Sequence, residues 1–437
     1  MEIERNFYVS QLLSKRNNGL VKVITGPRRV GKSYLLSHLY KNALLLDGVS
    51  PTNILQIELD KKKYVAYRNP DVLYTKVLDF AKNGNEKYYI FIDEVQMAYR
   101  VKNSDVDENS VPVEDQEMLY TTVYDVLNDL REQPNLDVYV TGSNSKMLSS
   151  DILTSFRDRG TVINVFPLSF AEYFPYSNKE KLDAWQEYMR YGGMPLAVLE
   201  SDENEKQKYL KGLYKKVYLK DIVERYHLTD DGVLSQIVNT LCSSVGSLTN
   251  PHNLANTIQS KWHYSVADKT IKKYIDYLED AFLFNEANRY DVKGKRYFSF
   301  PLKYYSTDVG LRNAQLNFRQ IDEGYLQENV IYNDLLRRGY AVDVGMVEIT
   351  KVVNGKAVQS QHEIDFIVNT NRGKVYIQSA ENIDSEELQQ REALSLKNTG
   401  DFFRKIIILG GNQKAWIDEN GIEYVGIIPF LLEELYL

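Results

Sequence analysis

A glycine-rich loop contains the residue types that bind a nucleotide phosphate. The stretch GPRRVGKSY has two glycines, a lysine and a serine at the spacing of a phosphate-binding loop. Glycines let backbone N–H groups turn toward phosphate oxygens, the lysine reaches the β and γ phosphates, and the serine hydroxyl binds Mg²⁺. We therefore expect ATP to bind to this loop, which consists of Gly26, Pro27, Arg28, Arg29, Val30, Gly31, Lys32, Ser33 and Tyr34.

The segments on either side of the loop fit the same interpretation. An apolar run at residues 20–24 predicts a strand, and apolar residues at helical spacing over 34–40 predict a helix. The alternative is a chance match to the loop pattern, which the flanking strand and helix make less frequent. No Asn-Lys-x-Asp guanine signature occurs in the sequence, so ATP is expected rather than GTP.

An acidic pair ends a second apolar run, KYYIFIDEVQ. A carboxylate at the carboxyl end of a parallel strand lies beside the phosphate loop. We expect Asp93 to hold Mg²⁺ together with Ser33, and Glu94 to polarise the attacking water as general base. The alternative is an acidic pair that only terminates a strand.

Two further segments offer candidate catalytic side chains. The run LDVYVTGSNSK predicts a strand after which Ser143 or Asn144 orients the water or senses the γ phosphate; the alternative is a polar turn. In SFRDRG, Arg157 or Arg159 at a helix end is a candidate arginine finger, acting within the chain or from a neighbouring subunit of a homo-oligomer. A surface salt bridge is equally consistent with these arginines.

The composition limits the class of protein. The 437 residues include 53 basic and 60 acidic side chains, a net charge of −7, which argues against a protein coated with nucleic acid over its whole surface. The single cysteine, Cys242, excludes an intrachain disulfide framework. The apolar runs are far shorter than the roughly 20 residues of a membrane span, and the first residues do not resemble a signal peptide. We expect a cytoplasmic protein without membrane contact.

Five stretches together resemble a known family. They are VITGPRRVGKSYLL, IFIDEVQ, YVTGSNSKMLSSDI, VFPLSFAEYF and YGGMPLAVL, and they resemble the archaeal-type ATPases, an AAA+-like branch of the P-loop ATPases found in bacteria and archaea. The resemblance covers roughly residues 1–200. It implies a five-stranded parallel core between helices, with Glu94 as the catalytic glutamate and Asn144 near the sensor position. The acidic stretch at residues 99–118 is expected to be a surface insertion.

Helical patterns follow this domain. We expect the nucleotide domain at residues 1–175 and a helical lid at 176–231. Residues 232–308 have the order helix, helix, helix, hairpin, which is a winged-helix pattern. Its basic residues favour DNA contact, whereas nearby acidic residues favour a protein-binding module: the basic set is Lys269, Lys272, Lys273, Arg289, Lys293, Lys295 and Arg296.

The last segment, residues 309–437, is similar to the restriction-endonuclease-like domain often fused to this ATPase family. That resemblance covers about residues 205–437, counting the winged helix. Glu328 matches the helix glutamate and Asp365 the strand aspartate of such a nuclease, whereas Gln378-Ser379-Ala380 replaces its acidic-x-lysine. Because the lysine that activates the nucleophile is missing, we expect no nuclease activity, with Glu328, Asp365 and Gln378 as a residual metal site.

The predicted fold class is α/β: a P-loop AAA+-like three-layer nucleotide domain, a helical lid, a winged helix and a C-terminal restriction-endonuclease-like α/β domain. The predicted function is Mg²⁺-dependent binding and hydrolysis of ATP, which drives a conformational switch between the ATPase core and the C-terminal domains. The alternative is a slow-turnover, nucleotide-gated module that binds DNA or a protein partner. A metal-dependent DNA nuclease is the third hypothesis.

Overall fold

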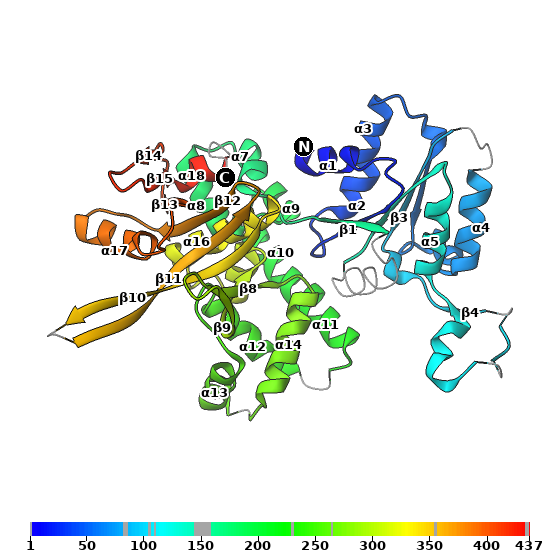
Figure 1. The fold of residues 1–437 in the computed structure, drawn as a ribbon. Coiled ribbons are helices and arrows are strands. Elements are labelled where there is room, and N and C mark those ends of the chain that lie inside the picture. The colour runs from blue at the N-terminus through cyan, green and yellow to red at the C-terminus, as the bar shows by residue number, and fades with distance from the viewer. Residues whose placement is uncertain are drawn as a thin grey trace. The chain divides into compact units, whose positions relative to one another are not determined.

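The structure of the chain is a computed structural model, and it describes residues 2–81, 86–103, 106–108, 111–143, 159–228, 231–263, 265–353, 356–432 and 437. The chain divides into two compact units, Glu2–Val165 and Phe166–Leu437. Figure 1 shows the elements of both.

The first unit is built on a parallel sheet with the strand order β2-β3-β6-β1-β7. The order places β6 between β3 and β1, so the carboxyl ends of these three strands meet at one edge of the sheet. The strands are β1 (Val21–Thr25), β2 (Ile54–Glu58), β3 (Tyr88–Asp93), β6 (Leu136–Thr141) and β7 (Gly160–Asn164).

Helices cover both faces of this sheet, because its strands are apolar on both sides. On one face Val23, Ile90 and Val138 pack in a core that includes residues of α4 and α5. On the other face Tyr139 contacts the ring of Tyr40 in η1, at a centroid distance of 5.0 Å. The helical elements are α1 (Asn6–Ser14), α2 (Lys32–Tyr34), η1 (Leu35–Tyr40), α3 (Lys41–Leu46), η2 (Pro51–Asn53), η3 (Lys62–Arg68), α4 (Pro70–Phe80), η4 (Val95–Met97) and α5 (Val123–Glu132). The predicted three-layer core is confirmed.

The predicted acidic insertion forms a small ribbon of its own. Strand β4 (Val101–Lys102) pairs antiparallel with β5 (Tyr120–Thr121), and the 3-10 helix η6 (Val113–Leu119) precedes β5. Val113 and Met118 in this stretch are largely exposed.

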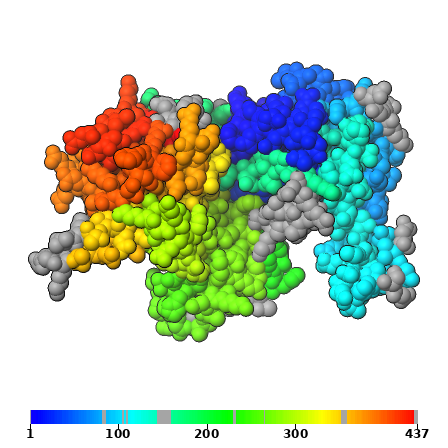
Figure 2. Space-filling model, viewed as in Figure 1, coloured from blue at the N-terminus to red at the C-terminus, as the bar shows by residue number. Residues whose placement is uncertain are grey.

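The second unit contains a mixed eight-stranded sheet with the order β14-β15-β13-β12-β11-β10-β8-β9. Its strands are β8 (Phe284–Asp291), β9 (Arg296–Ser306), β10 (Ala341–Val353), β11 (Lys356–Thr370), β12 (Gly373–Ala380), β13 (Arg404–Leu409), β14 (Trp416–Ile417) and β15 (Glu423–Gly426). Strands β10 and β11 extend outward from the rest of this unit (Figures 1 and 2). The α/β class, with a parallel P-loop-like core and a sheet-rich C-terminal region, is therefore confirmed.

The helix and hairpin order predicted for residues 232–308 is present. Helices α12 (Asp231–Ser243), α13 (Pro251–Trp262) and α14 (Asp268–Asp280) precede the antiparallel pair β8–β9. However, β8 also pairs in parallel with β10, for example Tyr290 with Gly345. The sheet thus runs across the boundary expected at residue 308.

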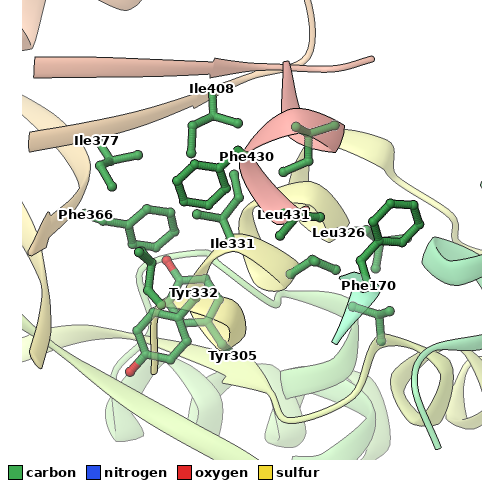
Figure 3. Packing of buried hydrophobic residues seen from close by; sticks show 14 of the residues in the cluster. Phe170, Tyr305, Leu326, Ile331, Tyr332, Phe366, Ile377, Ile408, Phe430 and Leu431 are labelled. Atoms are coloured by element: carbon green, nitrogen blue, oxygen red, sulfur yellow. The ribbon is translucent and has the colours of Figure 1, made fainter. Parts of the chain in front are cut away.

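Residues 166–231 also lie within the second unit. Phe170, from the VFPLSFAEYF stretch, packs in one core with Tyr305, Leu326 and Phe366 (Figure 3). The compact units therefore divide ten residues before the expected boundary at residue 175. The remaining helices are α7 (Phe170–Ser177), α8 (Lys181–Tyr191), α9 (Pro195–Leu199), α10 (Glu203–Gly212), η7 (Leu213–Leu219), α11 (Lys220–Arg225), α15 (Val309–Gln315), α16 (Glu323–Arg337), α17 (Glu386–Lys397) and α18 (Ile427–Leu431).

The two glycines of the YGGMP stretch allow a close backbone crossing in this unit. A Cβ on Gly193 would lie 2.0 Å from the carbonyl oxygen of Leu168, and one on Gly192 would lie 2.3 Å from the Asp308 carboxylate. The Gly193 N–H donates to Asp308 Oδ2 at 2.7 Å. Only glycine fits at either position.

Candidate nucleotide site

The glycine-rich loop lies at the carboxyl edge of the parallel sheet. It leaves β1 after Thr25 and enters α2 at Lys32. Gly26 has a φ of 141°, and a Cβ there would lie 2.1 Å from the carbonyl oxygen of Val165. Gly31 has a φ of 92° at the start of the helix. The first glycine is thus required by a backbone neighbour and the second by its own conformation.

The loop backbone is tied to the segment before α1. Arg5 is buried, and its Nη1 donates to the carbonyl oxygen of Val30 at 3.1 Å. Tyr34 OH donates to Glu2 Oε1 at 2.8 Å, and the Tyr34 ring stacks on His38. Contacts from residues outside the loop therefore hold its backbone and the Tyr34 side chain in place, and the sequence pattern does not predict these contacts.

Lys32 is buried under the loop that it follows. Its Nζ donates to the carbonyl oxygens of Gly26 and Pro27, at 2.9 and 2.8 Å. Burial lowers the pKa of Lys32 to about 8, although the negative charges of Glu94 and Asp93 oppose this shift. The ammonium is therefore held by weak neutral acceptors, which an anionic phosphate can replace.

Asp93 collects hydroxyl donors from two other segments. Ser33 Oγ donates to Asp93 Oδ1 at 2.9 Å, and Thr141 Oγ1 donates to the same oxygen. Burial raises the pKa of Asp93, and both hydrogen bonds oppose that rise. Thr141 was not predicted from the sequence; the usable signal is a hydroxyl residue at the end of an apolar strand that adjoins the acidic one.

Glu94 has a left-handed backbone, with a φ of 54°. Its N–H donates to Thr141 Oγ1 at 3.0 Å, so Thr141 bridges both acidic residues. The Glu94 carboxylate accepts hydrogen bonds from Gln96 Nε2 and, at 3.4 Å, from Ser143 Oγ. The structure thus brings Ser143 to Glu94, whereas Asn144 lies outside the described residues.

Two further carboxylates lie next to Asp93. Glu58 ends β2, which pairs with β3, and Glu58, Asp60 and Asp93 each have a carboxylate oxygen within 4.8 Å of the others. Carboxylate and hydroxyl oxygens are the ligands that Mg²⁺ prefers. The residues present therefore fit a magnesium ion, which Ser33 and Asp93 would hold and which would neutralise phosphate charge there.

The candidate arginines Arg28, Arg29 and Arg159 lie at different positions relative to the phosphate loop. Arg28 is half-buried and Arg29 is exposed with a φ of 66°. Arg159 is exposed and directly precedes β7, and its carbonyl oxygen accepts from Val21 N–H at the start of β1. It therefore lies at the amino edge of the sheet, opposite the loop, and the structure does not bring it to the phosphate site within this chain. Arg157 lies outside the described residues.

The residual metal site predicted in the second unit gathers around a lysine. Glu328 of α16, Asp365 of β11 and Gln378 of β12 lie together, and the Asp365 N–H donates to Gln378 Oε1 at 3.4 Å. Lys303 of β9 also reaches Glu328, with Nζ 2.8 Å from Oε1. Burial by itself would lower the pKa of Lys303, but the charges of Glu328, Asp365 and Glu363 outweigh it and raise the pKa. This lysine was not predicted from the sequence, although its place inside the apolar run PLKYY is a usable signal.

Several basic residues of the predicted winged helix are engaged inside the unit. Arg289 is buried with its guanidinium 5.1 Å from the Phe298 ring centroid, and Lys272 pairs with Glu286 at 2.8 Å. Lys293 Nζ donates to the carbonyl oxygen of Glu348. Internal contacts thus reduce the basic surface expected for DNA.

In the parts of the chain that the structure describes, no helix is long and apolar enough to cross a membrane.

Comparisons with known proteins match both units. The family described as "AAA domain" matches residues 18–174, and a domain of unknown function, DUF8612, matches residues 182–322. An uncharacterised protein of Haemophilus influenzae is 31% identical over 436 residues, 99% of each chain. An uncharacterised protein of Methanocaldococcus jannaschii is 25% identical over 364 residues, which cover 80% of this chain and 72% of the relative.

Among solved structures, Cdc6p of Pyrobaculum aerophilum aligns with 75% of this chain and 94% of its own, at 9% identity. Its TM-score of 0.28 is too low for a conclusion on fold or function. The family rests instead on the AAA-domain match and on the full-length Haemophilus relative. The chain belongs to the archaeal-type P-loop ATPases, in which a nucleotide-binding AAA domain is fused to a C-terminal region of unknown function.

Proposed function

We propose that this chain binds ATP with Mg²⁺ and hydrolyses it at the edge where β1, β3 and β6 end. The observation that carries this proposal is the convergence of three segments distant in sequence. Ser33 from the loop and Thr141 from β6 both donate to the Asp93 carboxylate at the end of β3. A chance glycine-rich turn has no reason to lie beside this set of oxygen ligands.

Each residue has a distinct task in this proposal. Lys32 exchanges its carbonyl partners for phosphate oxygens, while Ser33 and Asp93 hold Mg²⁺. Glu94 accepts a proton from the attacking water, and Gln96 and Ser143 orient its carboxylate. Thr141 is a positioning residue, because it fixes both Asp93 and the backbone of Glu94.

Phosphate release by the purified chain tests this proposal. We expect Mg²⁺-dependent release that Glu94→Gln lowers by about 10²–10⁴-fold while ATP still binds, because only the proton acceptor is lost. Lys32→Ala should lose ATP binding. A matched control is Glu86→Gln, a carboxylate that lies before β3 and bonds Asn53. Release that is equal in wild type and Glu94→Gln would exclude hydrolysis at this site.

The same nucleotide site is proposed to control the second unit. Val165 is the last residue of the first unit, and its N–H donates to the Thr25 carbonyl oxygen at 2.7 Å, next to Gly26. A change in the loop therefore acts directly on the point where the chain leaves the unit. Interdomain FRET in Glu94→Gln should differ between ATP and ADP; identical signals would contradict the switch.

The arrangement of α12–α14 with β8–β9 favours a second candidate, a slow-turnover module that binds DNA or a protein when ATP is bound. DNA titrations at several salt concentrations, with and without ATP, test DNA binding, and a pull-down with Glu94→Gln in ATP tests binding to a protein partner.

An arginine finger at Arg159 requires a homo-oligomer. Light scattering with ATP and the activity of mixed Arg159→Ala and Glu94→Gln chains test that role.

A further inference from the structure

Lys303 lies at the centre of three carboxylates in the second unit. Its Nζ is 2.8 Å from Glu328 Oε1, 2.6 Å from Glu363 Oε1 and 3.8 Å from Asp365 Oδ1. The Lys303 side chain is only 4% exposed, and those of Glu328 and Asp365 are 10% and 8% exposed. A buried carboxylate is stabilised in its ionised form by a nearby cation, because burial of an unpaired charge is very costly.

Other donors bind two of the same carboxylates. Tyr305 OH donates to Glu328 Oε1 at 2.6 Å, and Tyr305 itself is fully buried. The Ser379 N–H donates to Asp365 Oδ2 at 2.8 Å. One oxygen of Glu328 and one of Asp365 are thus bound by O–H and N–H groups of this chain in addition to the Lys303 ammonium.

The surroundings of the cluster hold Lys303 in place. It comes from the buried end of β9, where it pairs with Ala287 of β8. The neighbouring Tyr305 ring stacks on Tyr332 at 4.2 Å and lies near Phe366, as Figure 3 shows. Asn329 further ties Ser306 to α16 through hydrogen bonds in both directions. The lysine is therefore fixed by packing on the strand that supplies it.

We propose that Lys303 is the permanent counter-cation of this cluster, so that its ammonium replaces a divalent metal among Glu328, Glu363 and Asp365. The cluster then stabilises the fold and performs no metal chemistry in the wild-type chain. Loss of the Lys303 charge leaves three carboxylates facing one point and opens a latent divalent-cation site. This inference does not depend on ATP hydrolysis in the first unit.

Mn²⁺ is a suitable probe, since it takes carboxylate oxygens and its free form is counted by electron paramagnetic resonance. The experiment uses the full chain without nucleotide. Wild type and Glu328→Gln should bind the same number of Mn²⁺ ions. Lys303→Met should bind one more Mn²⁺ per chain than wild type, and Lys303→Met/Glu328→Gln should lose that ion. Mn²⁺ should raise the melting temperature of Lys303→Met and not that of the double variant.

Lys206→Met is the matched control. Lys206 is also buried, and its Nζ lies 2.6 Å from a single carboxylate, Glu187. Its replacement should lower stability without adding a Mn²⁺ site, because one carboxylate is a poor metal site. If Lys303→Met does not fold alone, expression in MnCl₂ that restores soluble protein supports the proposal, and Lys303→Gln supplies a second neutral variant.

Three results would overturn the proposal. One is a Mn²⁺ ion in wild type that Glu328→Gln removes, since a metal would then coexist with Lys303. Another is a folded Lys303→Met or Lys303→Gln that gains no Mn²⁺. The third is Mn²⁺-dependent cleavage of plasmid DNA that both Asp365→Asn and Lys303→Met abolish, which would make Lys303 part of a hydrolytic centre.

Discussion

Replacement of Gly26 by alanine tests whether the phosphate loop depends on its contact with Val165. The new Cβ would lie 2.1 Å from the Val165 carbonyl oxygen, whereas ordinary contact begins at 3.4 Å. The obstacle is backbone rather than a flexible side chain, and Val165 N–H is bonded to Thr25. Neither side can move without breaking the end of β7 away from β1.

The loss of stability follows from two terms. Overpacking against a fixed neighbour costs about 1–3 kcal/mol, and a φ of 141° adds strain of about 1–3 kcal/mol for alanine. The expected loss is therefore about 2–6 kcal/mol, a large share of the roughly 5–15 kcal/mol that stabilises a typical domain. ATP binding should be lost as well, because the displaced loop no longer presents its N–H groups.

Urea denaturation can assign this loss to the first unit. The three tryptophans, Trp185, Trp262 and Trp416, all belong to the second unit, so their fluorescence reports that unit. Circular dichroism reports both. Gly26→Ala should lower the stability of the transition seen by circular dichroism alone and leave the tryptophan transition in place.

Gly31→Ala separates strain from collision. Gly31 also has a positive φ, 92°, but nothing lies within 4 Å of a Cβ built there. Its loss of stability should be limited to strain, about 1–3 kcal/mol. Equal losses for Gly26→Ala and Gly31→Ala, or normal ATP binding by Gly26→Ala, would refute the role assigned to Val165.

Three other outcomes are expected. Thr141→Val removes one hydrogen bond from Asp93 and leaves the Glu94 N–H unpaired, which should lower the stability of the folded site by about 1–3 kcal/mol. Phosphate release should fall about tenfold or more. An unchanged rate of release would show that Thr141 has no role in the site. ATP affinity, measured by calorimetry from about pH 6.5 to 9.5, should be constant below about pH 8 and weaken above it, because Lys32 has a pKa lowered to about 8 and only its protonated form attracts phosphate. The Lys32→Arg side chain stays charged over this range, so its ATP affinity should not depend on pH in this way. A parallel decline of affinity in both proteins would contradict the role of Lys32 protonation. Gly193→Ala should lower the free energy of unfolding of the second unit, followed by tryptophan fluorescence, by about 1–3 kcal/mol, because its Cβ would contact the Leu168 backbone. Gly212→Ala, in a helix with nothing within 4 Å of its Cβ, should raise that free energy by about 0.5–1 kcal/mol. Similar shifts for the two variants would exclude the close backbone crossing at Gly193.

The nucleotide site could be predicted largely because its residues are local in sequence. The loop, its lysine and its serine are contiguous, and Asp93 with Glu94 ends a strand that is apolar throughout. Ends of parallel strands meet at one edge of a sheet, so these segments were expected to converge, and they do. Ser143 was one of two open choices and lies at Glu94; Asn144 and the other catalytic roles remain predictions.

Arg159 and the domain boundaries show where the pattern was insufficient. SFRDRG predicted a helix end with Arg157 or Arg159 as a candidate finger or salt-bridge residue, whereas Arg159 directly precedes β7 at the amino edge of the sheet. Likewise, the order of three helices and a hairpin in residues 232–308 could be predicted from the sequence, whereas the parallel pairing of β8 with β10 could not. Strand pairing between distant segments depends on how whole layers pack, and periodicity within one segment does not encode it.

By itself, the sequence determined the type of chemistry: a phosphate loop with its acidic partners, and a second carboxylate set without the expected lysine. Only the tertiary structure decided what completes each site. Thr141 joins Asp93 because β6 lies between β1 and β3, and Lys303 joins Glu328 and Asp365 because β9 ends beneath α16. The physical reason is the same in both cases. Buried polar groups need partners, and a fold supplies them from whichever segment passes nearby, at any distance along the chain.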